Sequence, residues 1–136
     1  MLDYEEKAIM RKVAATCELA GNNGYEPICF MKNWLASPTA HALYNMYFKE
    51  ISQSKQYLFH SVIAEMGLTP SGIYEPDLLY WAGYILTAFS FYYKLEPKMV
   101  LERYEIDRIL KCYDTLHTVS TTNAVNRIKE DFYQVL

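Results

Sequence analysis

The amino-acid sequence predicts an all-α fold: a small single-domain helical bundle, formed by residues 1–136 around one hydrophobic central helix. The main observation is the stretch Leu78–Tyr93, which runs for sixteen residues without a charge and carries seven aromatic rings. A helix that is apolar on all sides must be buried, either in a protein core or in a lipid bilayer. Gly and Pro number only five each, too few for the tight turns of an all-β sandwich. With 136 residues, of which 51% are hydrophobic, the chain is long enough to form one core.

We expect the central helix to lie inside a protein core and not in a membrane. Spanning a bilayer takes about 20 apolar residues, and this run is shorter. Its tyrosine hydroxyls would also lack hydrogen-bond partners in hydrocarbon. Pro76 precedes the run and Pro97 follows it; proline is favoured in the first turn of a helix, so each one predicts a helix start. Gly83 and Ser90 share one face of the central helix and are small enough to let another helix approach closely.

Helix start and stop signals divide the first part of the chain. Asp3 is followed three residues later by Glu6, which is the pattern of a capping box. The helix that begins there is expected to end at the loop Gly21–Gly24. Pro27 opens a second helix, and Ser37-Pro38, a capping residue followed by proline, opens a third.

The stretch Asn45–Ser54 is ambiguous, because it could continue the third helix or interrupt it. We favour a break, since Ser54 can cap a new helix that would end at Gly67. Beyond the central helix, we expect a short helix from Pro97 and a second that carries Ile106 to Tyr113.

His117 and Thr118 are expected in a connector that leads to a last helix capped by Ser120.

Composition and motifs exclude several classes of function. The formal net charge is −3 and the sequence pI is about 5.6, which disfavours a nucleic-acid partner because such surfaces are usually basic. Cys17, Cys29 and Cys112 are odd in number, far apart and without a CxxC pair, so they predict buried structural thiols and neither a disulfide framework nor a metal site. We expect no cofactor. The charged N-terminal segment does not resemble a signal peptide, and a reducing cytoplasm is the simplest location.

One group of polar residues could form a site, namely His117, Tyr113 and Arg108. The simpler interpretation is that His117 ties its connector by hydrogen bonds; the alternative is that it acts as a general base. The spacing between Arg108 and His117 does not match the Arg–His motif of helical ribonucleases. The chain also lacks a Gly-rich phosphate loop and a nucleophile elbow, so the sequence predicts no enzyme.

Tyrosine is the unusual residue of this chain, with 13 copies against 6 Phe and 2 Trp. Tyrosine suits both the edge of a core and the surface of a protein interface. We predict that the rings least needed by the core form a partner-binding surface. The best candidates are Tyr80 and Tyr84, on the stripe of the central helix turned away from Trp81, and Trp34, whose helix is short.

The segment from Ser71 to Ile85, with its Ser-Gly-x-Tyr and Tyr-Trp-x-Gly-Tyr elements, resembles a family of small, poorly characterised bacterial helical proteins. In the same register, Tyr113, His117 and Thr118 are similar to the family's Tyr-x-x-x-His-Thr element, and the resemblance extends to about Asp131. Family members are typically encoded beside small toxin-like proteins, among them ADP-ribosyltransferase-like ones. The resemblance implies an antitoxin-type, non-catalytic partner in a bacterial toxin–antitoxin system.

Two departures from the family pattern bear on this expectation. Thr87-Ala88-Phe89 stands where the family often has Arg-Tyr-Trp, so a polar contact made by that arginine does not carry over to this chain. Ser120 stands where the family has Asp, an exchange that is neutral at a helix N-cap.

Two functions are therefore carried forward. The first is a protein-binding module that covers a second bacterial protein, which the resemblance implies is a toxin encoded beside it. The second is a small enzyme or nucleotide-handling domain with a cleft near His117. A cleft that joins His117 to a carboxylate and an arginine would favour the second. The sequence leaves a homodimer open.

Overall fold

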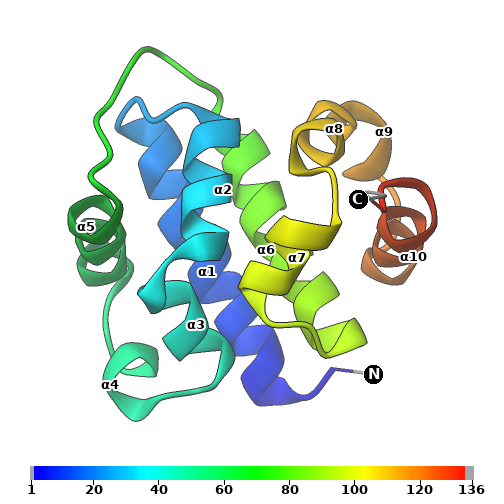
Figure 1. Cartoon of the computed structure of the whole chain (residues 1–136), viewed down its shortest axis with the longest axis horizontal. Coiled ribbons are helices and arrows are strands. Elements are labelled where there is room, and N and C mark those ends of the chain that lie inside the picture. Colours follow the sequence, from blue (N-terminus) through cyan, green and yellow to red (C-terminus); the bar gives the residue numbers. More distant parts are fainter. Residues whose placement is uncertain (1, 134–136) are drawn as a thin grey trace.

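The computed structural model describes residues 2–133, and these residues form one all-α domain, which confirms the predicted fold class. In that range an isolated antiparallel bridge between Tyr104 and Tyr133 accompanies the helices. The helices are shown in Figure 1 and are α1 (Tyr4–Asn22), α2 (Pro27–Ala36), α3 (Pro38–Tyr44), α4 (Phe48–Ile51), α5 (Lys55–Met66), α6 (Pro76–Tyr93), α7 (Pro97–Arg103), α8 (Ile106–Lys111), α9 (Tyr113–Leu116) and α10 (Thr121–Asp131).

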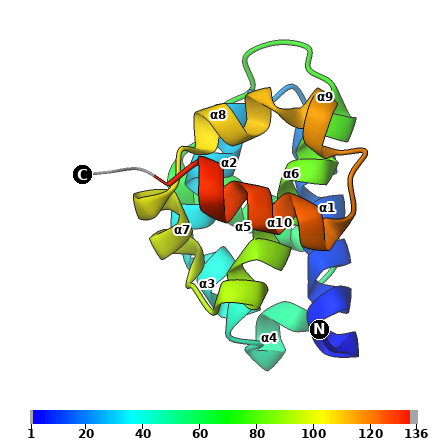
Figure 2. The same ribbon diagram turned by 90° about the vertical axis from the view of Figure 1, so that its right-hand side faces the viewer.

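The predicted central helix, α6, lies in the middle of the bundle beside α1 and α2 (Figure 1). Helix α5 flanks α1 on one side, and α8, α9 and α10 form the opposite side. The turned view in Figure 2 shows α10 running across α6, against which it packs. Within residues 2–133, none of the helices combines the length and the apolarity that a membrane crossing requires.

Among the helices described, α6 makes its most extensive contact with α1. A Cβ atom added at Gly83 would lie 2.8 Å from Cys17 Sγ and 3.2 Å from the Cα of Ala14. One end of α1 is equally close to α6, since a Cβ at Gly21 would lie 2.8 Å from the Cα of Pro76. Real Cβ atoms essentially never come as close as the two 2.8 Å distances, so any other residue at these two positions would require neighbouring atoms to shift. The prediction that Gly83 permits close helix approach is confirmed.

Local capping signals set most helix boundaries as predicted. Asp3 and Glu6 form a complete capping box, with the Asp3 carboxylate accepting from the Glu6 amide at 2.8 Å. The hydroxyls of Ser37, Ser54 and Ser120 each accept a hydrogen bond from an amide in the first turn of α3, α5 and α10. These bonds satisfy amide groups that have no partner within their helix.

The ambiguous stretch between the third and fourth predicted helices is a break, as favoured. Helix α3 ends at Tyr44, the single turn of α4 follows, and α5 starts at Lys55. A second boundary differs from the expectation. The helix predicted to run from Ile106 to Tyr113 is divided at Cys112, which ends α8 and precedes α9.

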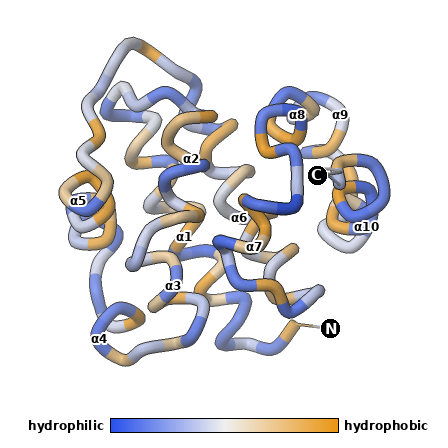
Figure 3. The backbone as a smooth tube through the Cα atoms, in the orientation of Figure 1, coloured by the Kyte–Doolittle hydropathy of each residue, from blue (hydrophilic) through white to orange (hydrophobic). Residues whose placement is uncertain are grey.

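Helix α10 packs an apolar side against the core and leaves a polar side in solvent. Ala124, Val125 and Ile128 are buried, whereas much of the helix is hydrophilic in Figure 3. Two tyrosines at the end of α6 attach it further. The hydroxyl of Tyr92 hydrogen-bonds Thr122 at 3.2 Å, and that of Tyr93 donates to the Asn126 side chain.

We predict that Gly83→Val will lower the free energy of unfolding by about 1–3 kcal/mol, because the new side chain would overlap Cys17 and the α1 backbone. Chemical denaturation followed by circular dichroism measures this change. Ala64→Val, at an exposed position of α5, is the control and should change stability by less than about 0.5 kcal/mol.

Cys17→Ala tests the cause of the Gly83 effect, because it removes the sulfur atom nearest to the new side chain. The double variant should be destabilised by less than the sum of the two single changes. If the two effects simply add, or if Gly83→Val is as stable as the control, the close packing of α1 and α6 does not limit this position.

Candidate functional site

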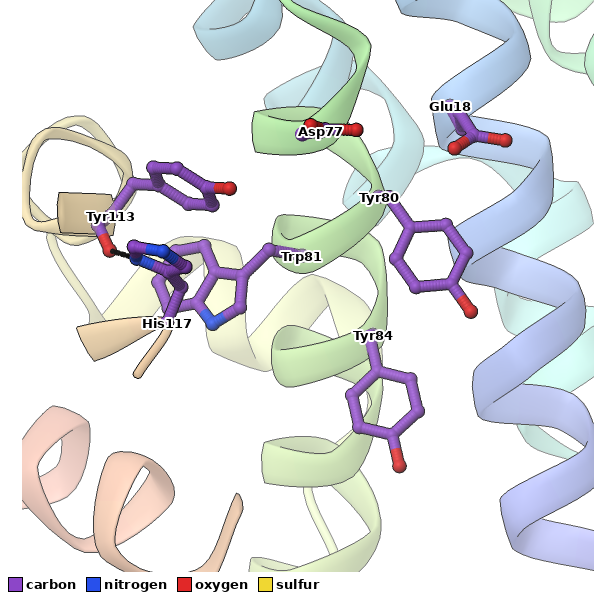
Figure 4. Close-up of a pocket in the computed structure, with 7 residues that line it drawn as sticks. All are labelled: Glu18, Asp77, Tyr80, Trp81, Tyr84, Tyr113 and His117. Carbon is purple, nitrogen blue, oxygen red and sulfur yellow. Dashed lines mark hydrogen bonds between the residues drawn. The ribbon is translucent and has the colours of Figure 1, made fainter. Parts of the chain in front are cut away.

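An open cavity of about 370 Å³ lies on the surface of α6. Figure 4 shows its seven lining residues, which come from α1, α6, α9 and the C-cap of α9. They are Glu18, Asp77, Tyr80, Trp81, Tyr84, Tyr113 and His117.

Helix α6 supplies four of these side chains because of their spacing along the helix. Asp77, Tyr80, Trp81 and Tyr84 are separated by three, four and seven positions, which brings them to one side of an α-helix. Tyr80 is 37% exposed, and Trp81 and Tyr84 are partly buried. In Figure 4, Tyr80 and Tyr84 lie on the side of α6 that faces α1, whereas Trp81 points toward Tyr113 and His117. The cavity therefore has aromatic rings on both sides of the α6 backbone.

The rings on the α9 side of the cavity contact one another in sequence. The Trp81 and Tyr113 rings meet edge to face with centroids 5.6 Å apart. The Tyr113 ring stacks on the imidazole of His117 at 4.1 Å and an interplanar angle of 11°. Edge-to-face and stacked pairs are favourable beyond the area that they bury, so these contacts hold α9 against α6.

A hydrogen bond fixes the orientation of His117. Its Nδ1 donates to the backbone carbonyl oxygen of Tyr113, at 2.6 Å, since a carbonyl oxygen only accepts. This is the kind of hydrogen bond that is expected if His117 ties the connector after α9. Figure 4 draws no hydrogen bond from the imidazole to Glu18 or Asp77.

The ionisable groups around the cavity are mainly acidic. Glu18 and Asp77 contribute carboxylates, and no Lys or Arg belongs to the lining. The mouth of the cavity therefore combines negative charge with the faces and edges of four aromatic rings.

The structure brings together four of the six residues predicted from the sequence. Tyr80 and Tyr84, predicted for partner binding, share one cavity with Tyr113 and His117, predicted for a polar site. Sequence reasoning had placed these two pairs in separate sites.

Arg108 does not join Tyr113 and His117, so the predicted polar trio is wrong. Its guanidinium pairs with Glu105 at 2.6 Å and lies over the Phe132 ring at 5.4 Å. It lines a different cavity, beside Lys32 and Asp107. There the hydrogen bond from Lys32 lowers the pKa of Asp107 from its ordinary value. Arg108 points elsewhere because α8 and α9 are separate helices with different directions.

Trp34 is also wrongly assigned, because its ring is only 3% exposed. It stacks on Phe30 at 6.5 Å inside the core. The short length of α2 suggested a free ring, but α2 is covered by neighbouring helices. Trp34 therefore stabilises the core and cannot anchor a partner.

Three lining residues were missed as site residues. Trp81 was expected on the stripe turned away from Tyr80 and Tyr84, but it is only partly buried and lines the same cavity as they do. Asp77 could have been found from its spacing to Trp81, which is four positions and so lies on the same face. Glu18 carries no sequence signal, because it reaches the cavity only through the packing of α1 on α6.

The three thiols differ in environment, which corrects one expectation. Cys17 is buried, as predicted, and burial raises the pKa of its thiol. Cys112 is partly buried, whereas Cys29 is exposed. In the part of the chain that the structure describes, no group of three His, Cys, Asp or Glu side chains is placed to hold a metal ion.

Comparisons with protein-family models, with curated proteins and with solved structures found no match for this chain.

We predict that Trp34→Ala will lower the free energy of unfolding by about 3–5 kcal/mol, because a large buried ring would be replaced by a cavity. Tyr4→Ala is the control, since Tyr4 is 81% exposed, and it should cost less than about 0.5 kcal/mol. Thermal and chemical denaturation measure both. Equal stability of the two variants would contradict the burial of Trp34.

His117→Ala should lower the free energy of unfolding by about 1 kcal/mol, because it removes one hydrogen bond and one ring stack at a solvent-exposed position. His117→Phe retains the stack and should lose less. His60→Ala, at an exposed position of α5, serves as the control. If all three variants unfold at the same denaturant concentration, His117 does not hold the connector.

Proposed function

We propose that this chain is a non-catalytic protein-binding module, which binds a second bacterial protein through the cavity on α6. The observation that carries the proposal is the group of partly exposed rings on one rigid helix, namely Tyr80, Trp81 and Tyr84, with Tyr113 beside them. Tyrosine and tryptophan are enriched among the residues that dominate binding energy at protein interfaces. Rings held on a packed helix lose little conformational entropy on binding.

The proposed partner is a toxin encoded beside this protein, in keeping with the sequence resemblance to antitoxin-type proteins. In this role the chain acts in the cytoplasm and neutralises the partner by covering part of its surface. An ADP-ribosyltransferase-like toxin is the kind of partner that the resemblance implies.

A second candidate function is a small enzyme or nucleotide-handling domain at the same cavity. The observation that favours it is the presence of His117 beside Glu18 and Asp77 in one lining. The arginine that this reading required is absent from the lining, because Arg108 is engaged with Glu105 elsewhere. The observations therefore favour the binding module.

Co-expression tests the proposed function. The neighbouring gene is expressed alone, with the wild-type chain, and with Tyr80→Ala/Tyr84→Ala, while growth and complex formation are measured. We expect toxicity alone and relief by the wild type. Each tyrosine replacement should cost about 2 kcal/mol of binding free energy, or about thirtyfold in affinity.

Tyr57→Ala is the matched control for this experiment. Tyr57 lies on α5, outside the α6 cavity, and its exposure of 41% is close to the 37% of Tyr80. It should relieve toxicity as well as the wild type does. A neighbour that is harmless alone, or that stays toxic with the wild-type chain, refutes the antitoxin role. Full relief by the double variant refutes only the cavity as the binding site.

A further inference from the structure

We propose that the α6 cavity receives the guanidinium group of an arginine side chain of the bound protein. This inference rests on the proposed function, and it specifies the chemistry that the cavity selects.

The sign of the charge around the cavity distinguishes it from three other cavities of similar size. These three, of about 510, 390 and 360 Å³, each contain at least one Lys or Arg together with carboxylates. Their charged groups include Lys98 with Glu96, Arg108 with Glu105, and Lys49 with Glu50. The α6 cavity instead has Glu18 and Asp77 with no lysine or arginine in its lining. The fixed charge of the lining therefore favours a positive group over a negative one.

The aromatic lining favours the same sign of charge. The face of a tryptophan or tyrosine ring attracts a cation through its quadrupole. The cavity presents Tyr80, Trp81 and Tyr84 along one helix and Tyr113 across from them. The aromatic and the acidic components of the lining therefore favour a cation over an anion or a neutral polar group.

Guanidinium fits this lining better than ammonium does. It is planar, stacks on aromatic faces, and is more weakly hydrated than an ammonium group. These properties suit an open depression, where a compact ammonium ion would keep most of its water. The fork of N–H donors can also bind a carboxylate in a bidentate manner. A volume of about 370 Å³ exceeds that of one guanidinium and leaves room for the neighbouring residues of a peptide segment.

Titration of the isolated protein with short peptides tests the inference. The probes are acetyl-Gly-Arg-Gly-amide, its lysine counterpart, and the counterpart with citrulline, which has nearly the shape of arginine without the charge. The NMR signal of the Trp81 indole N–H reports binding, and that of Trp34, buried in the core, is the internal reference. We expect a saturable shift of the Trp81 signal with arginine, weaker binding of lysine, and no saturable shift with citrulline.

Paired variants locate the site. Glu18→Gln/Asp77→Asn should weaken binding of the arginine peptide by about fivefold or more. Glu102→Gln/Glu130→Gln changes the net charge by the same amount at exposed positions outside the cavity, and should change the dissociation constant by less than about twofold. Tyr80→Leu keeps the charge and much of the apolar surface, removes one ring, and should weaken binding by about two- to fivefold. Dispersed NMR spectra confirm that each variant is folded.

Several results would overturn the inference. Equal binding of the citrulline and arginine peptides would show a neutral polar or apolar groove. Equal binding of lysine and arginine would remove the preference for guanidinium. Equal effects of the two charge-changing pairs would show a response to net charge only.

The titration does not use the partner protein, so its failure is separate from failure of the proposed function. Relief of toxicity without peptide binding would refute the guanidinium site alone. Peptide binding without relief of toxicity would refute the antitoxin role and leave the site standing.

Discussion

The close packing of α1 on α6 is the constraint on which the rest of the structure depends. At Gly83 the α6 backbone comes so near to Cys17 and Ala14 that a side chain there would force neighbouring atoms to shift. Gly21 and Pro76 repeat this arrangement at the other end of the contact. Because close contacts at Gly83 and at Gly21 fix the orientation of α6 relative to α1, the directions of the other faces of α6 are also fixed. The remaining helices pack against these faces. The cavity also depends on this contact, since Glu18 reaches it from α1.

The tyrosines of α6 allow a helix whose only charged residue is Asp77 to contribute to the core, to the edge of the bundle and to the surface. Phe89 and Phe91 are buried, whereas Tyr92 and Tyr93 place their hydroxyls against polar side chains of α10. Tyr80 and Tyr84 lie at the cavity. The hydroxyl of a buried tyrosine needs a hydrogen-bond partner or water. The tyrosines of α6 lie at positions where their hydroxyls reach polar side chains or solvent. This distribution gives a structural reason for the surplus of tyrosine.

The proposed recognition role depends on how rigidly the rings of the cavity are held. Its rings are carried by α6 and by α9, which is held to α6 through the Trp81–Tyr113–His117 contacts. The Nδ1 of His117 is occupied by its bond to the Tyr113 carbonyl, so the imidazole orients the connector. A fixed group of rings edged with carboxylates supplies a preformed surface, which reduces the entropy lost on binding. The proposed choice of arginine follows from the same group of residues.

The sequence by itself determined the helices and much of the α6 side of the cavity. The capping box of Asp3, the caps at Ser54 and Ser120, and the charge-free central run act through neighbours within a few positions, so their effects could be predicted. Tyr80 and Tyr84 were identified for the same reason, because residues three or four apart share a helix face.

Only the tertiary structure decided which helices cover which faces. It buried Trp34, directed Arg108 away from His117, exposed Cys29, and brought Glu18 to the cavity that Asp77 lines. The turn at Cys112 that separates α8 from α9 was also missed. These outcomes depend on contacts between residues that are distant in the chain. The directions of the helices, and close approaches such as that at Gly83, determine which neighbours each side chain contacts. Local periodicity defines the face of a helix, and packing against other helices determines whether that face is core or surface.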